Sequence, residues 1–311
     1  LYMPDFTKEK ILSEKPEFSP VNTERAYQNE VLGEFFAGSS SPISPEEIEA
    51  KCADMTRKFT GRISIQETTR KRVYAGFDWG QKSDLDQLGA GELGQRQTGQ
   101  SYSCAVILTA EGQHLLSIEF ATPLKKNDPE SKKEIVEEMF RRYNVHLAVG
   151  DVGYANDLTF NLQKEFGDKF LGSRATSQIK NHIKYAEDVF PKEITFERDY
   201  HIAELYDVMR QGRIKFPFGD YEKIAWLINH CCSMEIKVTK DMSGELKQRY
   251  VKGSTPNDGF MALLNAYLAY KFDITKGFSI KNPNEINEVV GKKEKIMAVL
   301  GYIPKLNPFK R

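Results

Sequence analysis

Residues 72–81 read RVYAGFDWGQ, a short apolar run that ends on Asp78, with one glycine two positions before this aspartate and another two positions after it. An apolar run of this length, bounded by glycine, predicts a buried β-strand. Two interpretations of Asp78 are open. It is either a solvated turn residue or a carboxylate at the tip of a buried strand, facing a metal ion or a phosphate. A second run of the same kind, VHLAVGDVG at 145–153, ends on Asp151.

The composition is that of a globular chain with one large domain and appended segments. The 311 residues are 40% hydrophobic, and 44 basic residues balance 44 acidic ones, so any basic surface must be local. No apolar run approaches the roughly 20 residues that span a bilayer, and no signal segment opens the chain, so we expect a cytosolic protein without membrane contact. The four cysteines contain no C-x-x-C pair and are expected to be reduced. The first residue is leucine, which suggests a fragment of a longer protein.

From residue 73 onward, the order of apolar runs, turn residues and amphipathic segments predicts an α/β domain. The strand at 73–78 is followed by a hairpin over 101–110 and 114–124, an amphipathic helix over 127–143, and the strand at 145–151. A helix between two such strands forms a βαβ unit, whose parallel strands end at the same edge of the sheet. Ligands of open α/β sheets bind at that edge, so Asp78 and Asp151 are expected there together.

The remaining sequence divides into three parts. Residues 1–72 are interpreted as a linker or the trailing edge of a missing domain, with one helix over 45–55 capped by Ser44. The domain continues to 272 through helices near 158–166, 202–209 and 220–231, strands at 193–199 and 213–218, a β-hairpin at 235–253, and a helix over 256–272. Residues 273–311 are a polar C-terminal tail.

A third aspartate, Asp258, lies in the first turn of the helix predicted over 256–272. Small residues recur along one face of this helix at Ala262, Ala266 and Ala269, which would let it lie close against a sheet and aim Asp258 toward it. The alternative is a capping box, in which Thr255 caps the helix and Asp258 reaches back to its N–H.

Three carboxylates close together cannot all stay ionised near neutral pH unless cations lie between them. If Asp78, Asp151 and Asp258 meet, they predict a site for a hard divalent cation, Mg²⁺ or Mn²⁺. Two such ions about 4 Å apart hold the attacking water and the leaving 3′ oxygen of a phosphodiester in line. The predicted chemistry is hydrolysis of nucleic acid.

The motifs GFDWG at 76–80, VGDVGYAND at 149–157 and PNDGFMALLNAYLAY at 256–270 occur in this order. The chain thereby resembles the nuclease domain of the terminase large subunit, the DNA-packaging motor protein of tailed bacteriophages. The resemblance covers about 73–272 and implies a ribonuclease H-like mixed α/β sheet flanked by helices, with an additional β-hairpin. It implies that the catalytic, metal-binding acids are Asp78 on the first strand, Asp151 on the fourth and Asp258 on a late helix, with two Mg²⁺ or Mn²⁺ ions.

The same resemblance implies a metal-dependent endonuclease of double-stranded DNA that acts in viral genome packaging. Its partners would be the portal protein, the small terminase subunit and other copies of the large subunit, at the procapsid in the host cytoplasm. Residues 25–38 and 41–50 look like the end of the family's motor domain. No G-x-x-x-x-G-K-[ST] loop occurs, so we expect no ATPase activity from this chain.

The hairpin at 235–253 is rich in basic residues, and in the family such a hairpin lies close to DNA. We expect it to contact phosphates, the alternative being an ordinary solubilising hairpin. Its candidate DNA-binding residues are Lys237, Lys240, Lys247, Arg249 and Lys252. If they do not bind DNA, the next basic surface is the one around Arg174, Lys180 and Lys184.

Two other functions are open. Sugar kinases and actin-like ATPases also place G-x-D-x-G on a first strand, but they need a Gly-Gly turn, and this sequence contains no Gly-Gly pair. A docking module of a packaging assembly with a degraded site is disfavoured because all three acids are present.

Other polar residues receive a structural interpretation. Asp84 and Asp86 could reach a metal but are more simply residues of a polar loop, and Asp157 would cap its helix. Glu119 would point to solvent, and His201 and His230 would be structural histidines on amphipathic helices.

Overall fold

The structure is a computed structural model that describes residues 41–80, 103–111, 115–124, 128–153, 155–176, 183–185, 190–240, 246–253 and 255–275. The chain divides into two compact units, Leu1–Tyr270 and Lys271–Arg311. Every strand of the described residues belongs to the first unit. Within the described ranges, no helix has the length and apolar character needed to cross a membrane.

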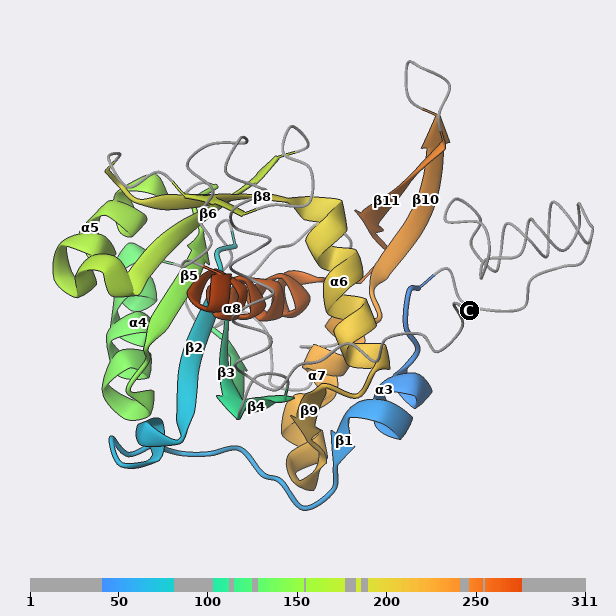
Figure 1. Ribbon diagram of the computed structural model, residues 1–311, viewed down its shortest axis with the longest axis horizontal. Coiled ribbons are helices and arrows are strands. Elements are labelled where there is room, and N and C mark those ends of the chain that lie inside the picture. Colours follow the sequence, from blue (N-terminus) through green and yellow to red (C-terminus); the bar gives the residue numbers. More distant parts are fainter. Residues whose placement is uncertain are drawn as a thin grey trace, which may run out of the picture. The chain divides into compact units, whose positions relative to one another are not determined.

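A mixed sheet forms the centre of the fold (Figure 1). Among the described residues it has nine strands, in the order β1-β9-β4-β3-β2-β5-β6-β8-β7. The strands are β1 (Ala53–Asp54), β2 (Lys71–Asp78), β3 (Cys104–Glu111), β4 (Leu115–Pro123), β5 (Leu147–Asp151), β6 (Phe170–Thr176), β7 (Ile183–Tyr185), β8 (Glu193–Glu197) and β9 (Ile214–Pro217).

The directions of the central strands establish the fold class. Strands β2, β3 and β4 form an antiparallel meander, while β5 pairs parallel with β2, β6 with β5, and β8 with β6. Three antiparallel strands followed by parallel strands on the other side of the first make the ribonuclease H-like arrangement. The predicted fold class is therefore confirmed, as is the hairpin of β3 and β4.

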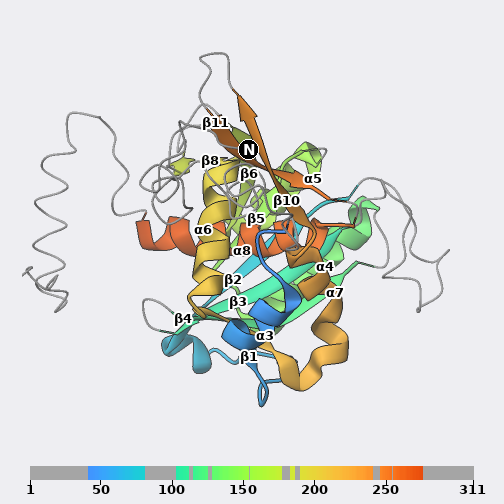
Figure 2. The ribbon, with the colours of Figure 1, turned by 90° about the vertical axis from the view of Figure 1, so that its right-hand side faces the viewer.

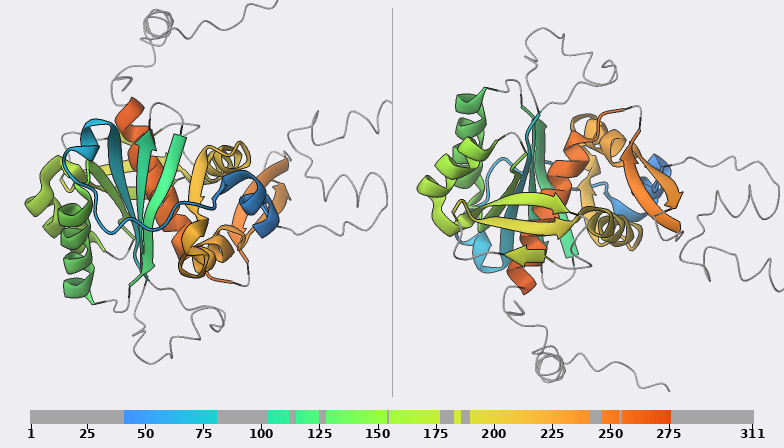
Figure 3. Two further views of the ribbon diagram at one scale, coloured as in Figure 1. Left: turned by 90° about the horizontal axis from the view of Figure 1, so that it is seen from below. Right: turned by 90° about the horizontal axis from the view of Figure 1, so that it is seen from above.

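Helices cover both faces of the sheet (Figure 3). They are α3 (Pro45–Cys52), α4 (Pro129–Tyr143), α5 (Asn156–Phe166), α6 (Arg198–Arg210), α7 (Tyr221–Cys231) and α8 (Asp258–Thr275), with short 3₁₀ turns η2 (Glu67–Thr69), η4 (Gly167–Lys169) and η5 (Phe218–Asp220). Helices α4 and α5 pack on one face, and α8 crosses the other. The amphipathic pattern over 127–143 forms α4 with Asp128 as its N-cap.

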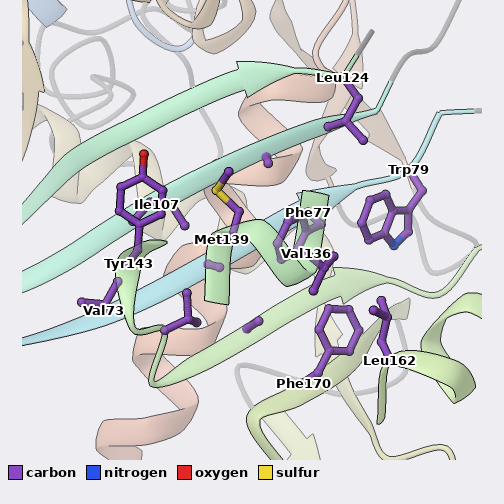
Figure 4. Packing of buried hydrophobic residues seen from close by; sticks show 14 of the residues in the cluster. Val73, Phe77, Trp79, Ile107, Leu124, Val136, Met139, Tyr143, Leu162 and Phe170 are labelled. Carbon is purple, nitrogen blue, oxygen red and sulfur yellow. The ribbon is translucent and has the colours of Figure 1, made fainter. Parts of the chain in front are cut away.

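The core between the sheet and α4 and α5 is built from alternate residues of the strands (Figure 4). Val73, Ala75 and Phe77 of β2 point into it, because successive side chains of a strand face opposite sides. Phe77 stacks on Trp79, with ring centroids 5.2 Å apart. Gly76 therefore faces the opposite side, toward α8.

Part of the segment interpreted as a linker is integrated into this unit. Ser44 caps α3, as predicted, and forms a capping box with Glu47. The helix ends at Cys52 and not at 55, because Ala53 and Asp54 then pair with β9 as strand β1. Ile48 and Cys52 are buried. The domain boundary at residue 72 stays a prediction.

The expectation that Glu119 points to solvent is wrong. Only 2% of its side chain is exposed, because residues 57–71 fold over this part of β4. Its carboxylate accepts hydrogen bonds from Thr60 Oγ1 at 2.6 Å and Thr109 Oγ1 at 2.8 Å, and pairs with Arg57 at 3.0 Å and Lys71 at 3.4 Å. Burial by itself raises the pKa of Glu119, but these donors and cations outweigh it and lower the pKa.

The predicted basic hairpin forms a separate two-stranded sheet of β10 (Met234–Lys240) and β11 (Leu246–Lys252). It lies beside α6 (Figure 2). Tyr250 of β11 is buried against Tyr206 of α6, with ring centroids 5.9 Å apart, and its backbone carbonyl accepts a hydrogen bond from Arg198 Nη1 at 2.6 Å.

The four cysteines carry free thiols, as expected.

Candidate active site

Two of the three predicted acids lie at the same edge of the sheet. Asp78 is the last residue of β2, and Asp151 is the last residue of β5. The two strands are parallel, and the last pair in their register is Phe77 with Gly150. Each aspartate directly follows this pair, so the two are neighbours at the carboxyl ends of adjacent strands. Both are only partly buried.

Helix α8 lies against β2 at a distance that only glycine allows. A Cβ atom at Gly76 would be 2.0 Å from the carbonyl oxygen of Ala262 and 2.2 Å from the amide nitrogen of Ala266. The face of small residues predicted for this helix is thus the face that contacts the sheet. Because the contact is made by backbone atoms, it sets how closely α8 lies on β2.

Asn265 joins α8 to β2, which carries Asp78, and to β6, the strand that pairs with β5. Its Nδ2 donates to the carbonyl oxygen of Phe77 at 2.6 Å, and Ser173 Oγ donates to its Oδ1 at 2.9 Å. Phe77 precedes Asp78, and Ser173 of β6 is the register partner of Asp151. Asn265 was not predicted as a site residue. The signal that could have identified it is a polar residue within the apolar run FMALLNAYLAY.

The first residue of α8 is Asp258, which is buried with 3% of its surface exposed. Asn257 lies at the N-cap, because its carbonyl accepts the first bond of the helix, from Met261 N–H at 3.0 Å. The capping-box alternative is wrong, since it requires Asp258 to be the third residue after a Thr255 cap and Asp258 is the first. The N–H of Gly259 instead donates to His230 Nδ1 of α7 at 2.9 Å.

The charges of the other two acids act on Asp78. Burial raises the pKa of Asp78 well above its usual range, and the negative charges of Asp258 and Asp151 raise it further. The positive charges of Lys252 and Lys132 act in the opposite direction. Like charges that share one site produce this pattern.

Opposing influences act on the pKa of Asp151. Burial raises its pKa, while hydrogen bonds from the backbone N–H groups of Gly153 and Val152 and the charge of Arg174 lower it. A Cβ at Gly153 would be 2.5 Å from Asp151 Oδ2, so glycine leaves room for the carboxylate. Arg174 is itself held by Glu193 through bonds of 2.9 Å and 3.2 Å.

Carboxylate oxygens are the donors that Mg²⁺ and Mn²⁺ prefer. Within the described residues, no group of three or more His, Cys, Asp or Glu side chains is gathered closely enough to hold a metal ion as it stands. Asp78, Asp151 and Asp258 nevertheless fit such an ion in their chemistry. A cation between them would offset the repulsion that raises the pKa of Asp78.

The candidate DNA-binding residues occupy different parts of the hairpin. Lys237 and Arg249 are exposed and directly opposite each other in the register of β10 and β11. Lys252, also exposed, ends β11 close enough for its charge to act on Asp78. The side chains of Lys240 and Lys247 lie outside the described part.

The other residues singled out in the sequence fall in several places. Asp84, Asp86 and Lys180 lie outside the described residues, and Lys184 is exposed on β7. Asp157 does not cap its helix: Ala155 is the N-cap of α5, and Asp157 lies in the first turn, because the helix begins two residues earlier than a cap at 157 requires. His201 and His230 are buried on α6 and α7, as expected for structural histidines.

Comparison with known proteins finds matches among solved structures. No protein-family model and no curated protein matches the chain. Among solved structures, the large terminase nuclease from thermophilic phage G20c is 12% identical, with a TM-score of 0.44 over 74% of this chain and 98% of that one, and its magnesium-bound form gives the same values. The nuclease domain of the large terminase subunit gp2 of bacterial virus Sf6 is 13% identical, with a TM-score of 0.41 over 72% of this chain and 96% of that one. The chain resembles these terminase nuclease domains in its fold.

Proposed function

We propose that this chain is a metal-dependent endonuclease that cuts double-stranded DNA during viral genome packaging. Asp78, Asp151 and Asp258 are its catalytic, metal-binding residues. The observation that carries the proposal is their convergence: two acids end adjacent parallel strands, and the third begins the helix that lies on one of those strands. The pKa of Asp78 responds to the charges of the other two.

Each acid has a defined part in the proposed mechanism. Asp78 would hold a metal ion together with Asp151 and Asp258, whose negative charges both act on it. Asp151 would keep its carboxylate oriented through the N–H groups of Val152 and Gly153. Asp258 is held at the start of α8. When bound, two Mg²⁺ or Mn²⁺ ions supply activation of a water and neutralise charge at the departing 3′ oxygen.

Positive charges flank the acids and suit a phosphate substrate. Lys252 ends the hairpin strand β11, Lys132 lies in the first turn of α4, and both act on Asp78. Lys132 Nζ donates to the carbonyl of Gly80 at 3.0 Å, which holds the segment that follows Asp78. We propose that DNA lies along the hairpin from Lys237 and Arg249 toward Lys252. Phosphate contacts of this kind carry little base preference.

The resemblance of the motifs extends the proposal to the packaging apparatus. In the infected host cytoplasm, at the procapsid, the chain would act with the portal protein, the small terminase subunit and other copies of the large subunit. It would not hydrolyse ATP by itself, because its sequence has no phosphate-binding loop.

Cleavage of supercoiled plasmid tests the proposal. We expect nicking and linearisation with Mg²⁺ or Mn²⁺ and none with excess chelator. Asp78→Asn should lower the rate by several orders of magnitude without unfolding the chain, because the change removes a ligand and also a like-charge repulsion. Asp168→Asn is the matched control, since this aspartate is 75% exposed and pairs with Lys192 away from the three acids. Cleavage that persists in chelator, or equal rates for the two variants, would refute the proposal.

A further inference from the structure

His230 contacts the helix that carries Asp258. It lies near the end of α7 with 4% of its surface exposed, and its Nδ1 accepts the N–H of Gly259 at 2.9 Å. Gly259 is the second residue of α8 and directly follows Asp258. The bond joins two helices that are separate in the sequence.

The first N–H groups of a helix have no partner within the helix, and a side chain at the N-cap normally accepts from the second or third of them. In α8 the second N–H, that of Gly259, donates to a side chain of another helix, His230 of α7. The N-cap residue, Asn257, uses its Nδ2 to donate to Met234 Sδ at 3.2 Å. His230 therefore does for this helix what a capping side chain does for others.

The packing around Gly259 holds the imidazole in place. A Cβ at this position would be 2.5 Å from Trp226 Cζ3, 2.9 Å from Leu227 Cδ1 and 3.0 Å from His230 Nδ1, so the glycine lets α7 approach the start of α8. The indole of Trp226 stands perpendicular to the His230 ring, at 90° with centroids 5.2 Å apart. In this orientation of the ring, Nδ1 accepts the Gly259 N–H.

The bond also defines the tautomer. Burial, together with the charge of Lys252, lowers the pKa of His230 to about 3, so the ring is neutral near neutral pH. Since Nδ1 accepts from Gly259, the ring proton is on Nε2. The Nδ1 lone pair is occupied by the helix and does not take a proton from water.

We propose that His230 is a positioning residue for the metal site: by anchoring the first turn of α8 through Gly259, it holds the Asp258 carboxylate where Asp78 and Asp151 can share a cation with it. This inference rests on the proposed function of the three acids. It goes beyond a structural role, because the loss of His230 should weaken metal binding and not only stability.

Titration of the whole chain with Mn²⁺ by calorimetry tests this role. His230→Leu removes the acceptor and should weaken Mn²⁺ binding about 10- to 100-fold, the usual effect of losing a group that orients a ligand. His230→Asn places a carbonyl oxygen near the position of Nδ1 and should keep the affinity of the wild type. His201→Leu is the matched control: His201 is also buried on a helix, but its Nδ1 is 3.1 Å from Glu204, so its loss should leave Mn²⁺ affinity unchanged.

The outcomes separate the two proposals. If Asp258→Asn weakens Mn²⁺ binding and folded His230→Leu does not, the positioning role is wrong and the metal site stands. If the wild type binds no Mn²⁺, or Asp258→Asn binds it equally well, the metal site itself is wrong. Should His230→Leu not fold, His230→Asn is compared with His230→Gln, whose carbonyl lies one bond further from the backbone. Weaker binding by the Gln variant supports the role, and equal binding by both contradicts it.

Discussion

Replacing Gly76 by alanine should damage both stability and the metal site, because this position sets how α8 lies on the sheet. The new methyl group would be 2.0 Å from the Ala262 carbonyl oxygen, whereas ordinary contact begins at 3.4 Å. The obstacle is backbone, so no change of rotamer relieves it, and α8 must move by about 1.4 Å. Overpacking of this kind costs about 1–3 kcal/mol, and we expect the upper end of the range.

The same displacement would carry Asp258 away from the other acids. A misplacement of about 1 Å can lower a catalytic rate about 100-fold, so a loss of at least that size is expected in DNA cleavage. Urea unfolding and the plasmid assay measure the two effects. Gly61→Ala is the control, because nothing lies within 4 Å of a Cβ there. If Gly76→Ala unfolds and cuts like Gly61→Ala, the seating of α8 does not position Asp258.

Individual contacts lead to three more predictions. Asn265→Leu should destabilise the fold by about 1–3 kcal/mol in urea unfolding, because it leaves the Phe77 carbonyl buried without its donor; an unchanged midpoint would contradict this. Glu119→Gln should lower the free energy of unfolding at pH 7, and this loss should shrink below about pH 4.5. The pKa of Glu119 is lower in the folded state, so the carboxylate stabilises the fold above its unfolded-state pKa and ceases to do so as it protonates. A stability difference between variant and wild type that does not depend on pH would refute the assignment. Replacing Lys237 and Arg249 together by alanine should flatten the slope of log DNA affinity against log salt by roughly one to two units, and an unchanged slope would show that the hairpin does not touch DNA.

Local patterns sufficed to predict the elements that position the acids. The runs at 73–78 and 145–151 are buried strands because they are continuous and apolar, and the amphipathic helix between the hairpin and the second run makes them parallel. The placement of Asp78 and Asp151 at one edge follows from that topology alone. The small-residue face of α8 could also be predicted, because a spacing of three or four residues places side chains on one face of a helix.

Features that depend on contacts between distant segments could not be predicted in the same way. Glu119 alternates with apolar neighbours as an exposed strand residue would, and only the chain at 57–71 folding over it makes it buried. Nothing in the sequence around His230 indicates that its side chain accepts a hydrogen bond from a helix that begins 28 residues later, at Asp258. Thr255 and Asp258 have the spacing of a capping box, but the helix begins after Asn257, where Gly76 and Gly259 let it fit against β2 and α7.

The central claim is that Asp78, Asp151 and Asp258 together bind the ions that cut DNA. A crystal structure of the chain soaked in Mn²⁺, with anomalous scattering to locate the metal, tests it most directly. We predict two peaks about 4 Å apart, with oxygens of all three carboxylates among their ligands. Manganese bound elsewhere, or a site that omits Asp258, would contradict the claim.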